Sequence, residues 1–256
     1  KNMIKIEIVP VLNDNYAYII HNEKKFQTAV IDPGDPEPII HILKEKQWNL
    51  DEIINTHHHN DHIAGNEKLI DIWRSKLIAP LYDKDRISNV DQYVSDGDVI
   101  NIVGINTHVI STPGHTLGHV CYYLKNEEIL FSGDTLFRLG CGRVFEGTME
   151  QMKNSLVKLR NLPNKTKVFC GHEYTLSNAK FCVYLQPNNI DINKKYDEIL
   201  KLRNKGAFTI PFRLDEEKRL NPFFQFDNKE FKKSISLESK NQTETFEYIR
   251  NKKDNF

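Results

Sequence analysis

The side chains best suited to chemistry stand together in one short string, His57–His62, which reads His-His-His-Asn-Asp-His. The string follows an apolar run typical of a strand and precedes a segment with a helical pattern. Alternate residues of an extended chain face the same way, so His57 and His59 can point into one site. Asp61 and His62 stand where the chain turns into the helix and can point in another direction. Because zinc, manganese and iron accept imidazole nitrogen and carboxylate oxygen, the string predicts ligands for two neighbouring metal positions.

Three further candidate ligands follow later apolar runs. They are His115 in Thr112–His119, Asp134 in Phe131–Thr135 and His172 in Phe169–Tyr174. A glycine directly precedes each of them, and glycine allows the backbone to approach a site closely. Functional side chains often stand on loops that a rigid scaffold positions. Each signal is weak alone, but together they supply the ligands that two metal ions need beyond the first string.

The remaining histidines fit ordinary roles. His21, His41, His58 and His108 are interpreted as surface or core residues, whereas His119 is expected to support a ligand rather than to bind metal. The sequence contains no H-E-x-x-H, no G-x-x-x-x-G-K-[ST] and no G-x-S-x-G pattern. Catalysis by a serine nucleophile therefore has no support.

The composition bounds the class of protein. Of 256 residues, 39% are hydrophobic and 27% are charged, which is an ordinary globular mixture. Lys+Arg and Asp+Glu number 35 each, so the basic excess of a nucleic-acid binder is missing. No apolar run reaches the roughly 18 residues of a membrane span. We expect a monomer that acts on a small molecule, with no nucleic-acid or membrane partner.

The cysteines indicate a reducing compartment. Cys121, Cys141, Cys170 and Cys182 form no C-x-x-C pair and do not resemble a disulfide framework. We expect reduced, mostly buried thiols. The expected location is the cytoplasm, or an organelle if a leader preceded Lys1.

Hydrophobic periodicity predicts strands and helices that alternate over the first two thirds of the chain. Strands are predicted at Ile4–Val9, Tyr16–Ile20, Thr28–Ile31, Glu52–Thr56, Val99–Val103, Thr107–Thr112, Val120–Leu124, Ile129–Phe131 and Lys167–Cys170. Helices are predicted at Ile39–Lys46, Gly65–Trp73, Met149–Leu159, Tyr174–Leu185 and Ile190–Lys205. Because strand signals nearly vanish later, we expect an α/β sandwich domain over residues 1–173 and a small helical domain over residues 174–256.

Over nearly its whole length, the sequence resembles the glyoxalase II (hydroxyacylglutathione hydrolase) family of the metallo-β-lactamase superfamily. The matching strings are Leu12–Tyr16, Thr56–His62, Ala64–Leu69, Thr112–His119, Gly133–Phe137, Gly140–Arg143, Cys170–Tyr174, Asn221–Phe223 and Arg250–Phe256. The metal-binding strings are shared across the superfamily, whereas Gly140–Arg143 and the basic terminal motif are far more specific to the family. The resemblance implies an αββα sandwich with a C-terminal helical domain that completes the substrate site.

The resemblance also implies a role for each candidate residue. One metal ion would be held by His57, His59 and His115, the other by Asp61, His62 and His172, with Asp134 bridging both. Asp61 and Asp134 are the residues expected to serve catalysis. The family's glutathione contacts match Arg143, Phe145, Tyr174, Arg250 and Lys253. Many relatives have Tyr where Phe145 stands, so one hydroxyl contact with the substrate is missing.

The implied enzyme is a thioester hydrolase. It would cleave S-D-lactoylglutathione and related 2-hydroxyacyl thioesters to glutathione and a 2-hydroxy acid such as D-lactate, by attack of a metal-bridging hydroxide, in methylglyoxal detoxification. Two divalent metal ions are expected per chain, with zinc favoured over iron and manganese.

Three other functions are open to this sequence. A glutathione-persulfide dioxygenase of the same fold would use a single iron, but such proteins lack the long helical tail with a terminal basic motif. A nuclease of the same superfamily would need a basic surface or an inserted domain, and neither is evident in the sequence. A non-catalytic protein that binds metal or a glutathione conjugate would not need the full set of ligands.

Overall fold

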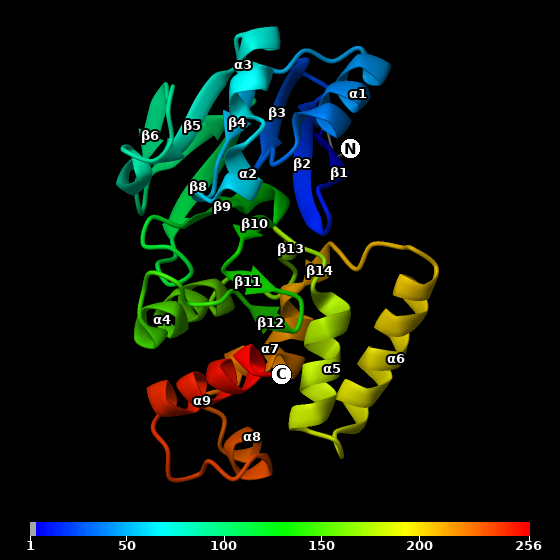
Figure 1. The fold of residues 1–256 in the computed structure, drawn as a ribbon, viewed down its shortest axis with the longest axis vertical. Coiled ribbons are helices and arrows are strands. Elements are labelled where there is room, and N and C mark those ends of the chain that lie inside the picture. The colour runs from blue at the N-terminus through cyan, green and yellow to red at the C-terminus, as the bar shows by residue number, and fades with distance from the viewer. Residues whose placement is uncertain (1–3) are drawn as a thin grey trace. The chain divides into compact units, whose positions relative to one another are not determined.

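The structure is a computed structural model that describes residues 4–256. Its backbone divides into two compact units (Figure 1). The first unit contains residues 4–111 together with Gly118–Glu127, and the second contains Thr112–Leu117 together with Glu128–Phe256. The predicted boundary between a catalytic domain (residues 1–173) and a helical domain (residues 174–256) stays a prediction.

A six-stranded sheet forms the framework of the first unit, with its strands in chain order. The strands are β1 (Ile4–Val11), β2 (Asn15–Asn22), β3 (Gln27–Ile31), β4 (Glu52–Ile54), β5 (Lys76–Pro80) and β6 (Gln92–Val94). Pairing is antiparallel from β1 to β3 and parallel from β3 to β6. The parallel half places the ends of β3 and β4 side by side. Asp32 directly follows β3, and the string His57–His62 begins shortly after β4.

Helices cover one face of this sheet. They are α1 (Pro36–Lys46) and α3 (Asn66–Trp73), with the short α2 (Asn60–Ile63) before α3. Buried Ile39, Leu43 and Leu69 of the helices pack into one core with alternate sheet residues such as Ile19 and Val30. Because side chains alternate across a strand, this core fixes which residues of the sheet face the helices.

Three more strands of the first unit form an antiparallel meander. They are β7 (Val99–Ile102), β8 (Ile105–Ser111) and β9 (Val120–Leu124), and the short helices η1 (Leu81–Asp83) and η2 (Lys125–Glu127) complete the unit. The meander is tied to the loop after β4, since Val120 N donates to Thr56 O at 2.9 Å and the Tyr122 hydroxyl donates to Asn55 O at 2.8 Å.

The second unit combines a few strands with most of the helices. Its strands are β10 (Ile129–Gly133), β11 (Leu136–Phe137), β12 (Gly140–Cys141), β13 (Lys167–Cys170) and β14 (Phe212–Arg213). Its helices are α4 (Met149–Arg160), α5 (Thr175–Leu185), α6 (Ile190–Asn204), α7 (Leu214–Leu220), η3 (Pro222–Phe224), α8 (Lys229–Ser234) and α9 (Gln242–Asp254). Strands β10 and β13 are parallel neighbours, and β11 and β12 form a short hairpin. A separate hydrophobic core, with Ala179, Ile199 and Leu220, joins α5, α6 and α7.

The predicted strands and helices agree with the structure within a few residues at each end. Residues 1–3 lie outside the described part, so the first predicted strand is tested from Ile4 onward. Sequence analysis gave no bounds for β5, β6, β11, β12, β14, α2, α7, α8, α9, η1, η2 and η3. Several of these are two or three residues long, which leaves no periodicity to detect.

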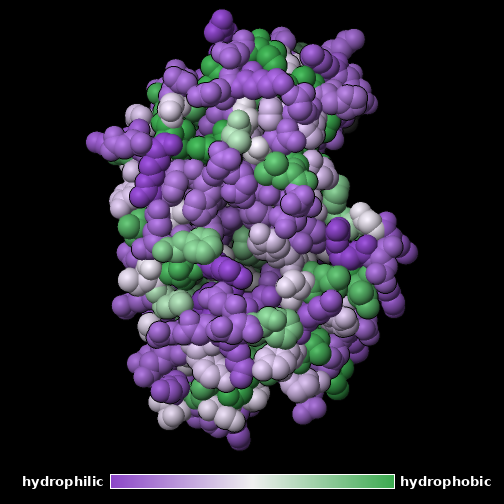
Figure 2. Space-filling view, in the orientation of Figure 1, coloured by the Kyte–Doolittle hydropathy of each residue, from purple (hydrophilic) through white to green (hydrophobic). Residues whose placement is uncertain are grey.

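The expectations for thiols and surfaces can be compared directly with the structure. All four cysteines are buried and form no disulfide bond, as predicted. Within residues 4–256, no helix is both long enough and apolar enough to cross a membrane. On the face drawn in Figure 2, hydrophilic residues predominate and hydrophobic ones occur in separate patches.

Candidate metal centre

The string His57–His62 spans the end of the loop after β4 and the beginning of α2, and its side chains converge. His57 Nε2 lies 3.1 Å from His59 Nδ1, and His62 Nε2 lies 3.4 Å from Asp61 Oδ2. His57 and His62 are buried, while the Asp61 side chain is 41% exposed. We call His57, His59, Asp61 and His62 the first ligand group.

Asp32, which sequence analysis did not select, binds Thr56 and His62 on either side of the string's first residues. It accepts hydrogen bonds from Thr56 N at 2.8 Å and Thr56 Oγ1 at 2.6 Å, and it lies 3.0 Å from His62 Nδ1. The ring of His62 is thereby fixed with Nε2 directed at the other ligands. Asp32 is 3% exposed and has a φ of 50°. The available signal was an acidic residue at the end of a buried strand, directly before Pro33.

Two further contacts fix the first ligand group. Thr56 Oγ1 lies 2.9 Å from His57 Nδ1, so Nε2 is the nitrogen of His57 that faces the ligands. Asn15 Nδ2 donates to Asp61 Oδ2 at 2.8 Å. The turn after β3 packs so closely here that a Cβ on Gly34 would lie 1.9 Å from Asp61 O. A side chain at position 34 would displace the loop that carries the ligands.

In the second unit, a carboxylate lies between two imidazoles. Asp134 Oδ2 is 3.4 Å from His115 Nε2 and 3.2 Å from His172 Nε2. All three side chains are at least nine-tenths buried. The Nδ1 atom of His115 lies 2.9 Å from Arg143 O, which orients this ring. We call His115, Asp134 and His172 the second ligand group.

Both ligand groups suit divalent metal ions. Their donors are imidazole nitrogens and carboxylate oxygens, the set that zinc, iron and manganese accept. Outer contacts engage Nδ1 of His57, His62 and His115, so Nε2 of each ring is directed at the other ligands. Metal-binding histidines are typically oriented in this way.

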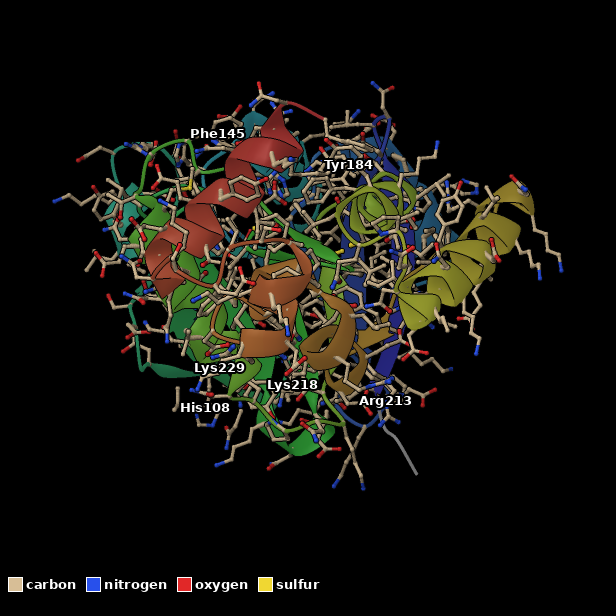
Figure 3. All side chains as sticks on the ribbon, turned by 90° about the horizontal axis from the view of Figure 1, so that it is seen from below. His108, Phe145, Tyr184, Arg213, Lys218 and Lys229 are labelled. Carbon is tan, nitrogen blue, oxygen red and sulfur yellow. The ribbon has the colours of Figure 1, made fainter. Side chains whose placement is uncertain are left out.

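The other histidines have surroundings of their own. His58 Nδ1 lies 3.2 Å from the buried carboxylate of Asp83. His119 is fully buried, with its ring 4.9 Å from that of His57. His21 is buried, lies 2.9 Å from Thr28 Oγ1 and stacks on Trp48. His41 Nε2 lies 3.9 Å from Glu45 Oε2 on α1. His108 is a half-buried residue of β8 (Figure 3).

Two aromatic residues predicted to contact substrate stand beside the second ligand group. The Tyr174 ring stacks on His172 with centroids 4.6 Å apart and is 37% exposed. Phe145 lies 5.2 Å from the His115 ring and is 62% exposed (Figure 3). Both rings are therefore accessible apolar surfaces next to candidate ligands.

The three predicted cationic contacts differ in exposure. The Arg143 side chain is 62% exposed, and its Nε lies 3.7 Å from Asp254 Oδ1. Arg250 is only 3% exposed. Lys253 Nζ donates to Ser177 Oγ at 3.0 Å, and its pKa is lowered by burial and by the positive charges of Arg250 and Arg143. The three cations are thus close enough to influence one another, and an anion bound beside them would relieve their repulsion.

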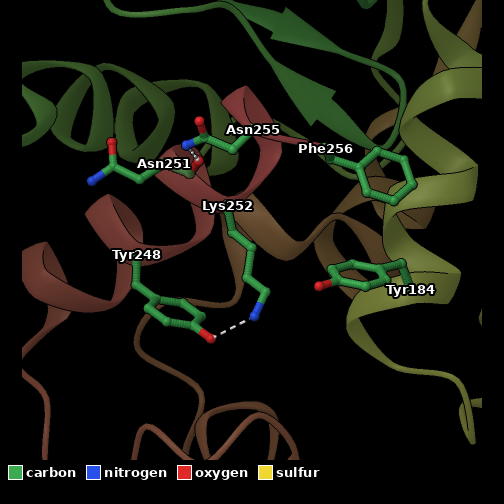
Figure 4. Close-up of a pocket in the computed structure, with 6 residues that line it drawn as sticks. All are labelled: Tyr184, Tyr248, Asn251, Lys252, Asn255 and Phe256. Carbon is green, nitrogen blue, oxygen red and sulfur yellow. Dashed lines mark hydrogen bonds between the residues drawn. The ribbon is translucent and has the colours of Figure 1, made fainter.

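A surface pocket that sequence analysis did not suggest lies beside α9. It has a volume of about 560 Å³ and is lined by Tyr184, Tyr248, Asn251, Lys252, Asn255 and Phe256 (Figure 4). Within it, Lys252 Nζ donates to the Tyr248 hydroxyl at 3.0 Å. Lys252 is therefore engaged at a different place from Lys253, although the two residues are adjacent in sequence.

A cysteine stands close to these cations but is a poor nucleophile. Burial raises the pKa of the Cys141 thiol to about 11, against the opposing effect of Arg250. Near neutral pH the group is therefore a neutral thiol rather than the reactive thiolate. Its backbone carbonyl, not its sulfur, is the atom that the neighbouring arginine binds most closely.

Two family models together match residues 12–256. The metallo-beta-lactamase superfamily model matches residues 12–172, and the model of the hydroxyacylglutathione hydrolase C-terminus matches residues 173–256. The hydroxyacylglutathione hydrolase of Bartonella henselae is 44% identical over 244 residues, covering 95% of this chain and 96% of the relative. That of Methylococcus capsulatus is 40% identical over 254 residues, covering 99% of both chains.

Solved structures show the same fold at lower sequence identity. BLEG-1 B3 metallo-beta-lactamase has a TM-score of 0.67 at 23% identity, covering 86% of this chain and 99% of its own. ETHE1 from Myxococcus xanthus has a TM-score of 0.68 at 24% identity, covering 97% of this chain and 89% of its own. The predicted fold class, a metallo-β-lactamase type with a C-terminal helical region, is confirmed. The chain belongs to the hydroxyacylglutathione hydrolase family of the metallo-β-lactamase superfamily.

Proposed function

We propose that the chain is a thioester hydrolase that cleaves S-D-lactoylglutathione and related 2-hydroxyacyl glutathiones. The observation that carries this proposal is the match of residues 173–256 to the C-terminus of hydroxyacylglutathione hydrolases, because this region distinguishes them within the superfamily. Relatives with that name are 40% and 44% identical over at least 95% of the chain. The products would be glutathione and D-lactate, as in methylglyoxal detoxification.

The proposal assigns the ligands to two divalent metal ions. His57, His59 and His115 would hold one ion, and Asp61, His62 and His172 would hold the other, with Asp134 shared. The position of Asp134 Oδ2 between two imidazole nitrogens supports its shared role. Zinc is our first choice of metal, with iron and manganese as alternatives of the same ligand preference.

The residues of the chain then have distinct tasks. Bound divalent ions would lower the pKa of a coordinated water far below its usual value, toward about 7, and polarise a carbonyl group. Asp134 and Asp61 would orient the attacking water through their carboxylates. The leaving thiolate, with a pKa near ~8.5, departs with little assistance. The principal task of the protein is therefore to hold the thioester carbonyl beside the ligand groups.

Glutathione recognition would depend on the cations and aromatic rings of the second unit. Arg143, Arg250 and Lys253 provide positive charge for the two carboxylates of the tripeptide, through charge-assisted hydrogen bonds. Tyr174 and Phe145 would pack against its apolar parts. Since Phe145 has no hydroxyl group, that contact is limited to packing.

We further propose a cytoplasmic monomer with no nucleic-acid or membrane partner.

A thioester assay tests the proposed activity. The metal-loaded chain is mixed with S-D-lactoylglutathione, and the loss of thioester absorbance is followed while dissolved oxygen is recorded. We expect rapid loss of absorbance at constant oxygen. Oxygen consumption with glutathione persulfide, and no thioester cleavage, would instead identify the single-iron dioxygenase and overturn the proposal.

A further inference from the structure

The segment Gly140–Arg143 lies against the second ligand group. A Cβ on Gly142 would be only 1.9 Å from Asp134 O, so the segment requires glycine to approach this closely. Gly142 N also donates to Thr135 O at 3.2 Å. A shift of the segment by a few tenths of an ångström would therefore also displace the backbone of Asp134.

The same segment orients His115 through a carbonyl group. Arg143 O lies 2.9 Å from His115 Nδ1, and the opposite nitrogen of the ring, Nε2, lies 3.4 Å from Asp134 Oδ2. The carbonyl therefore selects the tautomer with a proton on Nδ1, in which Nε2 carries the lone pair that a metal ligand needs. Whatever fixes Gly140–Arg143 also fixes the direction of His115.

Arg250 of α9 fixes this segment from the other side. Its NH1 donates to Cys141 O at 2.7 Å. Its Nε and NH2 donate to Asp254 Oδ1 at 3.1 Å and 2.8 Å, and the guanidinium lies 5.0 Å from the Phe223 ring. With 3% exposure, the side chain is engaged inside the protein rather than directed toward solvent.

A second anchor holds the hairpin that leads into the segment. Asn221 Nδ2 donates to Gly140 O at 3.1 Å, and Glu217 Oε2 accepts from Leu139 N at 2.7 Å and from Asn221 Nδ2 at 2.9 Å. The hairpin is thus held by α7 at one end and by α9 at the other. Arg250 is the anchor closer to Arg143, because its acceptor is the carbonyl of Cys141.

We propose that Arg250 is a positioning residue for the metal ligand His115, acting through the Cys141 carbonyl and the Arg143 carbonyl. The proposal rests on the proposed function only in taking His115 as a ligand. It gives Arg250 a second task, in addition to the glutathione contact proposed above. A contact with the substrate predicts a change in KM alone, whereas a positioning role predicts a change in metal binding with no substrate present.

The test measures Co²⁺ binding by the full-length chain. Wild type, Arg250→Ala, Arg250→Lys and Asp254→Asn are titrated with Co²⁺, and both the dissociation constant and the visible absorption are recorded. Loss of an outer contact to a metal ligand typically costs ~10–100-fold in metal affinity, and we expect Arg250→Ala to fall in this range with altered absorption bands. Arg250→Lys should recover part of the affinity. Asp254→Asn should weaken binding less, because it loosens the guanidinium without removing it.

Lys252→Ala is the matched control, since it removes one positive charge from the same helix without touching the hairpin. It should bind Co²⁺ as wild type does. If Arg250→Ala does not fold, judged by circular dichroism, Arg250→Lys and Asp254→Asn decide the matter. Unchanged affinity and absorption in the folded Arg250 and Asp254 variants would overturn the positioning role, even if KM rises. Failure of wild type to cleave the thioester would instead overturn the proposed function and leave the Co²⁺ result intact.

Discussion

The first ligand group comes from one stretch of six consecutive residues, whereas the second comes from three separate segments of its unit. The first is held by nearby residues of its own sheet, such as Asp32 at the end of β3. The second depends on a carbonyl whose segment is held by helices near the end of the chain. The local chain therefore brings the first group together and its own sheet orients it, whereas tertiary packing both assembles and orients the second group.

The largest effect should follow from the residue that contacts two imidazoles of the second group. Asp134→Asn keeps the shape of the side chain but removes its charge. We expect losses of metal occupancy and turnover beyond the ~10–100-fold typical of outer contacts. His58→Ala, which alters a histidine inside the first string, should change both much less. Metal analysis beside steady-state kinetics checks the pair, and equal losses would mean that the ligands are wrongly assigned.

Asp32→Asn tests the support of the first ligand group. The amide can accept from Thr56 N but cannot also hold His62 Nδ1 as a carboxylate does, so metal affinity should fall by ~10–100-fold. Asp35→Asn is the matched control, because Asp35 only caps α1 by accepting from Glu37 N at 3.0 Å. Competition with a metal indicator measures both variants. The idea fails if the two aspartates prove equally dispensable.

Lys253→Ala tests substrate recognition in the second unit, with the metal ligands left in place. A charge-assisted contact contributes about 1.5–3 kcal/mol, and for this half-exposed lysine we expect a loss near the lower limit, a rise in KM of about 10-fold. Turnover should change less, since the contact is remote from the carbonyl. Added salt should weaken binding in wild type more than in the variant. A KM equal to that of Lys252→Ala and wild type would exclude this contact.

The last prediction concerns stability rather than activity, at the α7 anchor of the second group. Burial raises the pKa of Glu217 from 4.5 to about 7, with Arg138 and the hydrogen bonds from Leu139 and Asn221 opposing the rise. The folded chain therefore keeps a proton that the unfolded chain has lost, so stability falls as pH rises from about 4.5 to about 7 and is level beyond. The span corresponds to on the order of 3 kcal/mol. Glu217→Gln should remove this part of the pH dependence in urea unfolding. An identical slope in both proteins would contradict the assigned cause.

The same contrast explains what the sequence could predict. In the string His57–His62, the direction of each side chain follows from the alternation of an extended chain and from the turn into a helix. Its four ligand candidates could therefore be chosen from residue type and spacing. His115, Asp134 and His172 gained weight as a set, and the resemblance to a family supplied the rest. Asp32 was missed, because its role arises from strand pairing between β3 and β4, which no local pattern shows.

The surroundings of Arg250 show what residue type alone cannot reveal. Two cations three positions apart on a helix indicate a shared face for an anion, yet the structure buries Arg250 and leaves Lys253 half-exposed. The difference depends on the Cys141 carbonyl, which belongs to a two-residue strand that periodicity cannot detect. Burial of a charged group is decided by partners that are distant in sequence.

The central claim of the proposed function is that the chain uses two metal ions in one reaction, and stepwise metal loading tests it most directly. Metal-free chain is titrated with Zn²⁺, and thioesterase activity toward S-D-lactoylglutathione is measured at each ratio of metal to protein. The account predicts that activity rises until about two ions are bound per chain, that chelation abolishes it, and that Asp134→Asn fails to reach this ratio. Full activity at one ion per chain, with no further gain on loading a second, would contradict it.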